Sequence, residues 1–140
     1  MQQVILITGT SSGFGAMAAR ALARAGHHVY ATMRDPSANG GAAAAAFAKL
    51  AGDEGLALET LALDVTSQVS VDAAVDAVLK QAGRIDILIH NAGHMAFGPT
   101  EAFTPEQFAR LYDVNVIGTQ RLNRAALPAM RAAEIGRAHV

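Results

Sequence analysis

Cysteine is absent from this chain of 140 residues, which excludes disulfide bonds, thiolate metal sites and cysteine nucleophiles. Net charge is also nearly absent, because 11 Lys and Arg residues stand against 12 Asp and Glu residues and leave a formal charge of -1. A nucleic-acid or anionic-membrane surface is therefore not expected. No apolar run approaches the ~20 residues that a membrane-spanning helix needs. The first residues contain no basic segment ahead of an apolar stretch, so we expect a cytoplasmic protein rather than a secreted one.

Hydrophobic residues make up 51% of the chain and charged residues 16%, a balance typical of a folded domain rather than a disordered tail. The length corresponds to one domain, since domains most often contain about 100–150 residues. A chain of ~150 residues can bury roughly 70% of its unfolded surface, so a substantial core is expected. The five histidines show no spacing typical of a metal site, and we expect no metal.

Strand-like and helix-like segments alternate four times along the chain. The predicted strands span 4–7, 28–33, 56–63 and 85–89, and the predicted helices span 16–25, the region around 47–50, 71–82 and a long stretch from 108 to 130. The first strand, Val4–Ile7, is apolar without polar alternation, as in strands buried on both faces of a parallel sheet. The long helix follows a capping pattern, Thr104-Pro105-Glu106-Gln107, and should be disturbed at Gly118 and Pro128. Such alternation predicts an α/β fold with parallel strands joined by right-handed crossovers.

A glycine-rich turn, Thr8 to Gly15, lies between the first strand and the first helix. Gly9 would allow the tight turn, and Gly13 and Gly15 would let phosphate oxygens and the neighbouring strand approach the backbone. In dinucleotide-binding folds a pyrophosphate rests at this helix N-terminus, held by backbone N–H groups and the helix dipole. A glycine pattern alone also fits an ordinary turn, but the strand before it and the helix after it favour a nucleotide site.

The spacing of this turn is Gly-x-x-x-Gly-x-Gly, and it resembles the Thr-Gly-x-x-x-Gly-x-Gly turn of the short-chain dehydrogenase/reductase family. Three further motifs agree with that family in order and position: Asp64-Val65, Asn91-Ala92-Gly93 and Asn115. His90 departs from the family's Asn-Asn-Ala-Gly sequence, where an asparagine precedes the other three residues. The resemblance covers residues 3 to about 134, nearly the whole chain.

The resemblance implies the N-terminal part of a doubly wound parallel Rossmann sheet, with strand order 3-2-1-4 and flanking helices. It implies cofactor contacts from Gly9, Ser11, Gly13, Phe14 and Gly15 in the turn, from Asp64 and Val65 at the adenine, and from Asn91, Ala92 and Gly93. Asn115 is the implied catalytic residue, a helix asparagine that breaks regular hydrogen bonding and helps to hold a proton-relaying water. Each motif taken alone has a plainer interpretation: an aspartate that simply precedes a capping hydroxyl, a simple turn or an ordinary helix residue. For His90 we expect a structural hydrogen bond rather than a catalytic role.

The end of the second strand decides between the two nicotinamide cofactors. An acidic side chain there binds the adenosine ribose of NAD, whereas an arginine accommodates the 2′-phosphate of NADP. Met33 occupies the position of the family's NAD-selecting acid, and Arg34 follows it. Asp35 is a rival ribose ligand, but Pro36 places it beyond the strand. We therefore expect NADP(H) to be preferred, with Ser11 adding a hydroxyl to the same phosphate, while NAD(H) remains the alternative.

The family's reaction needs a Tyr-x-x-x-Lys pair and a serine from the fifth strand, and none of these is found here. Tyr30 and Tyr112 lack a lysine four residues on, and the two lysines, Lys49 and Lys80, fall on predicted outer helices. We therefore expect residues 1–134 to be an incomplete dinucleotide-binding domain of a longer enzyme, with the fourth strand left as an unpaired sheet edge. Residues 135–140, Ile-Gly-Arg-Ala-His-Val, resemble the translated read-through of a sequencing adapter and predict a non-native tail. The alternative is a native helix end.

Two hypotheses for the function result from these patterns. The first is an NADP(H)-dependent oxidoreductase that interconverts a carbonyl and a secondary alcohol, inactive in the form given by this sequence. The second is a short nucleotide-binding or regulatory module that performs no reaction. For the enzyme, His94, Met95 and Phe97 are the candidates to line a small-molecule substrate pocket, and the resemblance implies a homodimer or homotetramer.

Overall fold

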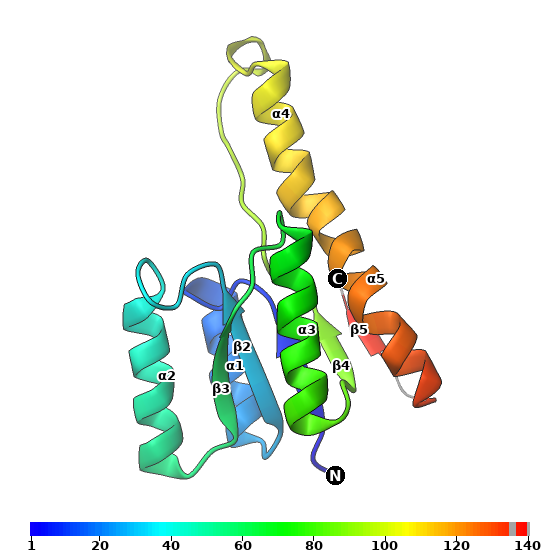
Figure 1. Cartoon of the computed structure of the whole chain (residues 1–140). Coiled ribbons are helices and arrows are strands. Elements are labelled where there is room, and N and C mark those ends of the chain that lie inside the picture. Colours follow the sequence, from blue (N-terminus) through cyan, green and yellow to red (C-terminus); the bar gives the residue numbers. More distant parts are fainter. Residues whose placement is uncertain (135–136, 140) are drawn as a thin grey trace.

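Short apolar strands and amphipathic helices build a central parallel sheet that is covered on both faces (Figure 1). The computed structural model describes residues 1–134 and 137–139. The strands are β1 (Val4–Ile7), β2 (His28–Met33), β3 (Leu58–Ala62), β4 (Ile87–Ile89) and β5 (Arg137–His139). The helices are α1 (Gly13–Arg24), α2 (Gly41–Glu54), α3 (Gln68–Ala82), α4 (Pro105–Tyr112) and α5 (Gly118–Ala132), with a 3-10 turn η1 (Thr100–Ala102) and a π-helical segment η2 (Asp113–Ile117). Among the described residues, none of the helices has the length and apolar character needed to cross a membrane.

All strand pairs in the sheet are parallel, and the strand order is β3-β2-β1-β4-β5. The predicted order 3-2-1-4 is therefore confirmed. The expectation of an unpaired edge at β4 is wrong, because the backbone of β5 pairs with β4 in the register Ile87↔Arg137 and Ile89↔His139. An unpaired edge exposes backbone N–H and C=O groups, and an extended segment that follows α5 satisfies them here.

β5 lies inside the segment 135–140, for which the sequence predicts a non-native tail. Residues 135, 136 and 140 of that segment lie outside the described residues. The backbone pairing of residues 137–139 with β4 is part of the fold, and the non-native origin of the segment stays a prediction.

Two separate hydrophobic clusters lie on the two faces of the sheet, because successive side chains of a strand point to opposite faces. In β1, Val4 and Leu6 belong to one cluster, while Ile5 and Ile7 belong to the other. The first cluster contains residues of α3 and α5, including Val71, Val75, Val78, Leu122 and Met130. The second contains residues of α1 and α2, including Ala16, Ala19, Ala23 and Phe47. All four residues of β1 are buried, as predicted for a strand covered on both faces.

Local sequence signals set most of the helix ends. Thr104 and Gln107 form the predicted capping box at α4: the Thr104 hydroxyl oxygen accepts from the Gln107 N–H at 3.3 Å, and Gln107 Oε1 accepts from the Thr104 N–H at 2.8 Å. Ser67 caps α3 in the same way, as its hydroxyl oxygen accepts from a backbone N–H. The helix predicted to begin at Ala16 begins at Gly13 instead. The last glycines of the turn already take helical hydrogen bonding there, since the Ala16 N–H donates to the Ser12 carbonyl at 3.4 Å.

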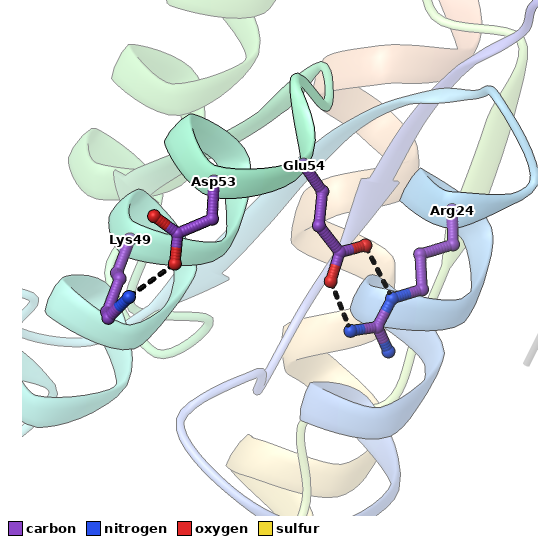
Figure 2. A network of polar contacts seen from close by, with 4 residues as sticks. All are labelled: Arg24, Lys49, Asp53 and Glu54. Carbon is purple, nitrogen blue, oxygen red and sulfur yellow. Dashed lines mark hydrogen bonds and ion pairs between the residues drawn. The ribbon is translucent and has the colours of Figure 1, made fainter.

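Charged side chains also join α1 and α2 at their C-terminal ends (Figure 2). Arg24 donates from Nε and Nη2 to the two carboxylate oxygens of Glu54, at 2.9 and 2.7 Å, and Lys49 pairs with Asp53 within α2. These side chains are exposed, so solvent screens the ion pairs and they contribute little to stability. The fully buried Phe47 side chain contributes more to holding α2 on the sheet.

Candidate functional site

The carboxyl ends of the strands open into a cavity of about 540 Å³, which we call the main cleft. Doubly wound α/β sheets bind their ligands at this edge. The residues around the cleft come from the turns after β1 and β4, the first turn of α1, the ends of β2 and β3, and η2: Gly9, Ser11, Ser12, Phe14, Met33, Arg34, Leu63, Asp64, Val65, Thr66, Asn91, Ala92, Gly93, His94 and Val114. The structure thus brings together all the predicted cofactor-contacting residues except Gly13 and Gly15, whose backbone begins α1.

The turn after β1 places the N-terminus of α1 beside the main cleft. The Ser12 side chain at the start of α1 makes no capping hydrogen bond, so the first N–H groups of the helix can bind an anion. Gly9 has a φ of +71°, and a Cβ there would lie 2.7 Å from the Ala92 Cα. At Gly15 a Cβ would lie 2.4 Å from both Asn91 Nδ2 and the Gly9 carbonyl oxygen. Glycine is required at both positions for this turn to pack against the segment after β4.

Hydrogen bonds between Thr8 and Asn91 join the end of β1 to the end of β4. The Asn91 side-chain amide donates to the carbonyls of Thr8 and Gly9 at 3.1 and 2.9 Å. The Thr8 hydroxyl oxygen accepts from the backbone N–H groups of Asn91 and Ala92 at 3.1 and 3.0 Å. The Asn91 amide therefore holds the wall of the cleft, and its cofactor contact stays a prediction. The sequence placed Thr8 in the turn motif but did not predict these hydrogen bonds, because its partner lies 83 positions further along the chain.

Arg34 and Asp35, the two charged residues after β2, have different surroundings. Arg34 is exposed and lines the main cleft. Asp35 lies outside the cleft, and its Oδ1 accepts from the N–H and hydroxyl of Ser37 and from the Ala38 N–H, at 3.0, 2.7 and 3.0 Å. The hydrogen bond from the Ser37 hydroxyl is the main reason that the pKa of Asp35 is lowered. The Asp35 carboxylate is thus engaged by its own turn.

Asp64 follows β3 and presents a carboxylate at the cleft. Its Oδ1 accepts from the backbone N–H and the hydroxyl of Thr66, at 2.9 and 2.7 Å. Partial burial by itself would raise the pKa of Asp64, but these hydrogen bonds and the nearby charges of Arg34 and Arg121 outweigh it and lower the pKa. Asp64 also precedes a capping hydroxyl, as its plainer interpretation expects, because Ser67 caps α3.

Asn115 lies in η2, where the helix from α4 to α5 changes to π-helical hydrogen bonding. The implied break in regular helix hydrogen bonding is therefore present. Asn115 Oδ1 accepts from the His94 N–H at 3.0 Å, and its Nδ2 donates to the His94 carbonyl at 2.9 Å. Asn115 thus fixes the segment that follows Gly93, and its catalytic role stays a prediction.

His90 makes the structural hydrogen bond that the sequence predicts. Its Nε2 lies 2.9 Å from Oδ1 of Asn123 on α5. Burial lowers the pKa of His90, although the hydrogen bond to Asn123 opposes this effect. The neutral imidazole is therefore favoured in the folded chain.

A second cavity of about 480 Å³ adjoins the main cleft. Arg34, Thr66, His94 and Val114 line both spaces. The other walls come from the segment after Gly93 and from α4 and its flanks: Ala96, Phe103, Gln107, Arg110, Leu111 and Asp113. Of the three substrate-pocket candidates, His94 reaches these spaces, whereas Met95 and Phe97 are 77% and 86% exposed and line neither. Sequence reasoning missed this cavity because residues 94–103 have no periodicity that would place them beside α4.

The main cleft offers groups that bind and orient a ligand. They are the start of α1, the guanidinium of Arg34 and the carboxylate of Asp64, a set that suits an anionic nucleotide. Of the described tyrosines and lysines, none lines the cleft. Tyr30 is buried in the core, and the others lie on α2, α3 and α4. This part of the protein therefore contains no Tyr–Lys pair for proton transfer among its described residues.

Comparison with known proteins agrees with this geometry. A family model described as short chain dehydrogenase matches residues 3–138. The chain is 38% identical over 135 residues to 3-ketodihydrosphingosine reductase of Bacteroides thetaiotaomicron, and 45% identical over 137 residues to 17-beta-hydroxysteroid dehydrogenase type 1 of Homo sapiens. Both alignments cover 96% of this chain but only 45% and 40% of the two relatives, so the chain spans less than half of their length.

Solved structures show the same similarity in three dimensions. A gluconate 5-dehydrogenase from Burkholderia cenocepacia, in complex with NADP and tartrate, has a TM-score of 0.86 at 32% identity, with 99% of this chain and 52% of that chain covered. A short-chain dehydrogenase from Streptomyces avermitilis has a TM-score of 0.85 at 35% identity, with 99% of this chain and 48% of that chain covered. The sequence match, the sheet topology and the cleft agree, and the chain belongs to the short-chain dehydrogenase family.

Proposed function

We propose that this chain is the cofactor-binding half of an NADP(H)-dependent oxidoreductase that interconverts a carbonyl and a secondary alcohol of a small molecule. The start of α1, Arg34 and Asp64 support the nucleotide part of the proposal, since they surround a cleft at the carboxyl edge of parallel strands. Relatives named as a reductase and a dehydrogenase support the reaction class. When bound, the cofactor would supply hydride transfer, and the protein would supply binding and orientation.

The contrast between Arg34 and Asp35 is the observation that supports NADP(H) over NAD(H). Arg34 lines the main cleft with a planar, charged guanidinium that suits a phosphate. The Asp35 carboxylate accepts three hydrogen bonds from its own turn and lies outside the cleft. Met33, at the position of the NAD-selecting acid, is apolar and buried. Asp64, the acidic residue that does line the cleft, stands at the end of β3 instead.

The other predicted residues would divide the remaining contacts with the cofactor. The N–H groups at Gly13, Phe14 and Gly15 would meet the pyrophosphate, because they begin α1 without a side-chain cap. Asp64 and Val65 would hold the adenine, and Ser11 would add a hydroxyl at the 2′-phosphate. The wall of the cleft beside the nucleotide would be formed by Gly9, Asn91, Ala92 and Gly93. Asn115 would fix this wall through its hydrogen bonds to His94.

Titration calorimetry with NADPH and NADH tests this proposal. Arg34→Ala should weaken NADPH binding by about tenfold or more and leave NADH binding nearly unchanged, because a hydrogen bond to a charged group contributes about 1.5–3 kcal/mol. Arg124→Ala is the matched control, since Arg124 is an exposed arginine on α5 that lines neither cavity. Equal losses for the two cofactors would contradict the NADP(H) preference. Absence of binding by the unsubstituted chain would contradict the nucleotide site itself.

We also propose that the whole protein is a homodimer or homotetramer. α4 and η2 project away from the sheet (Figure 1), and their apolar side chains Phe108, Tyr112, Val116 and Ile117 are exposed. A second copy that covered these side chains would remove apolar surface from water. Analytical ultracentrifugation of the whole protein should show a dimer or tetramer that Phe108→Ser dissociates, and a monomer at micromolar concentration would contradict the proposal.

One observation favours a second candidate, a nucleotide-binding module without catalysis. No described tyrosine or lysine lines the main cleft, so the proton-transfer pair of the family is missing from this part of the protein. The gene sequence beyond residue 140 separates the two candidates. A continuing frame with Tyr-x-x-x-Lys supports the enzyme, whereas a natural stop together with tight NADPH binding supports the module.

A further inference from the structure

Two arginines from distant parts of the chain line the second cavity together. Arg34 comes from the end of β2 and Arg110 from the last turn of α4. Within the described part of the chain, all ion pairs are formed by other residues. Like charges that share a cavity repel each other, so an anion between them would interact favourably with both.

Hydrogen bonds already engage the carboxylates of Asp113, which lines this cavity, and of Asp64, which lines the adjoining main cleft. Asp113 accepts from Nη2 of Arg121 at 2.6 Å. Asp64 feels the charge of Arg34, but its Oδ1 accepts both hydrogen bonds from Thr66. Arg110 therefore forms no ion pair with a carboxylate of the described residues.

Arg110 lines the second cavity close along the chain to a residue that lines both spaces. Arg110 lies in the last turn of α4, and Val114 follows it in the π-helical segment η2. Val114 lines both the main cleft and the second cavity, and so does Arg34. An anion held by Arg34 on the side of the second cavity would thus have Arg110 as a second cation that lines the same space.

We propose that Arg110 is the second cation of the 2′-phosphate site and determines cofactor specificity together with Arg34. This inference rests on the proposed NADP(H) function. A phosphate monoester carries about -1.5 to -2 charges at pH 7, more than the single positive charge of one arginine neutralises. Guanidinium groups from β2 and α4 would neutralise the dianion together and bind more of its oxygens than one arginine can. The ligand class is a nucleotide with a phosphate monoester on its ribose.

Affinities for NADPH and NADH, measured side by side, test the role of Arg110. Arg110→Gln should weaken NADPH binding by about tenfold and leave NADH binding unchanged, the pattern of a lost contact to a charged group. Arg110→Lys retains the charge and should recover part of the lost affinity. Arg124→Gln, which removes an exposed arginine outside both cavities, should change neither affinity. NADH affinity also reports on folding, since a misfolded variant loses both cofactors.

Three results would overturn the inference, and each has a different pattern. If Arg34→Ala weakens NADPH binding more than NADH binding and Arg110→Gln does not, then Arg34 binds the phosphate alone and the proposed function stands. If Arg110→Gln loses binding of inorganic phosphate but keeps its NADPH affinity, the cavity is a site for a free anion. If the unsubstituted chain binds neither nucleotide, the proposed function and the inference fail together.

Discussion

Asn115 and His94 exchange two hydrogen bonds, so a side-chain amide from η2 satisfies both backbone polar groups of one residue after β4. The two hydrogen bonds resemble those that a residue of a neighbouring strand makes: Asn115 Oδ1 accepts at 3.0 Å and Nδ2 donates at 2.9 Å. This exchange requires a side chain that has both a donor and an acceptor. π-Helical turns inside helices occur frequently at functional sites. Here the π-helical turn directs Asn115 to the segment that borders both cavities.

Asn115→Asp should destabilise this segment, because a carboxylate keeps the acceptor but loses the donor to the His94 carbonyl. We expect the lost hydrogen bond to lower the free energy of unfolding by about 1 kcal/mol. Asn115→Leu removes both bonds and should also speed hydrogen exchange of the His94 N–H, measured by NMR or mass spectrometry. Gln120→Leu, which removes an exposed amide from α5, is the control. Unchanged protection of the His94 N–H in Asn115→Leu would show that the amide does not hold the segment.

Local patterns predicted the parts of this molecule that depend on neighbouring residues. The apolar run Val4–Ile7, the capping box at Thr104 and the parallel pairing of the strands all agree with the structure, and so does the strand order that the family resemblance implied. These features depend on side-chain periodicity, on hydrogen bonds within one turn and on the handedness of crossovers. Asn115 is intermediate, since a family motif predicted the helix irregularity but not its hydrogen bonds to His94.

Contacts between distant segments account for what the sequence did not predict. Thr8 holds Asn91 from 83 positions away, and the cavity that Arg34 and Arg110 both line depends on how α4 stands beside the sheet. The pairing of β5 with β4 likewise depends on the path of the chain after α5 rather than on a local pattern. No periodicity or spacing rule encodes such approaches, because they are set by the packing of whole elements.

Tyr30→Phe should stabilise the folded chain. The Tyr30 side chain is fully buried on β2, and no described residue gives its hydroxyl a hydrogen bond. A buried polar group without a partner costs about 1–3 kcal/mol, so its removal should raise the free energy of unfolding by about 1 kcal/mol. Urea unfolding monitored by circular dichroism measures the change. A loss of stability instead would mean that the hydroxyl has a partner in solution, such as a water molecule.

Tyr30→Phe should also reduce the amount of stability that the folded chain loses at alkaline pH. Burial, with a further contribution from the charge of Glu59, raises the pKa of Tyr30 to about 12. An unfolded tyrosine ionises near pH ~10. Between these values the unfolded chain releases a proton that the folded chain keeps, so stability falls as pH rises. Tyr30→Phe should remove this part of the fall between pH ~10 and ~12. Tyr112→Phe, on the exposed side of α4, is the matched control and should lack the gain in stability at neutral pH.

His90→Asn should make stability less dependent on pH on the acid side of neutrality. Burial lowers the pKa of His90 in the folded chain, whereas an unfolded histidine titrates near pH ~6.5. Below that pH the unfolded chain binds a proton that the folded chain does not, so stability falls as the solution is acidified. Above that pH the neutral ring is present in both states and His90 contributes no slope.

Urea midpoints for the two proteins between pH ~5 and ~8 measure this contribution of His90. Subtracting the profiles cancels the other histidines, which are unchanged by the substitution. His27→Asn is the comparison variant, because His27 lines neither cavity and its Nδ1 accepts from the Gln3 N–H at 3.3 Å instead. Parallel profiles for the unsubstituted chain and His90→Asn would contradict a lowered pKa at this site.

Gly15→Ala should disrupt the main cleft, whereas Gly52→Ala should stabilise the fold. A methyl group at Gly15 would lie 2.4 Å from Asn91 Nδ2 and from the Gly9 carbonyl oxygen, so the turn after β1 and the segment after β4 must move apart. We expect the free energy of unfolding of Gly15→Ala to fall by about 1–3 kcal/mol and NADPH to bind more weakly. Gly52 lies in α2 with no atom within 4 Å of its would-be Cβ, and replacing a helix glycine with alanine contributes roughly 0.5–1 kcal/mol. Urea unfolding of both variants checks that the free energy of unfolding falls in Gly15→Ala and rises in Gly52→Ala. NADPH titration checks that only Gly15→Ala binds the cofactor more weakly. Full stability and full affinity in Gly15→Ala would show that the close contact between these two turns is not needed.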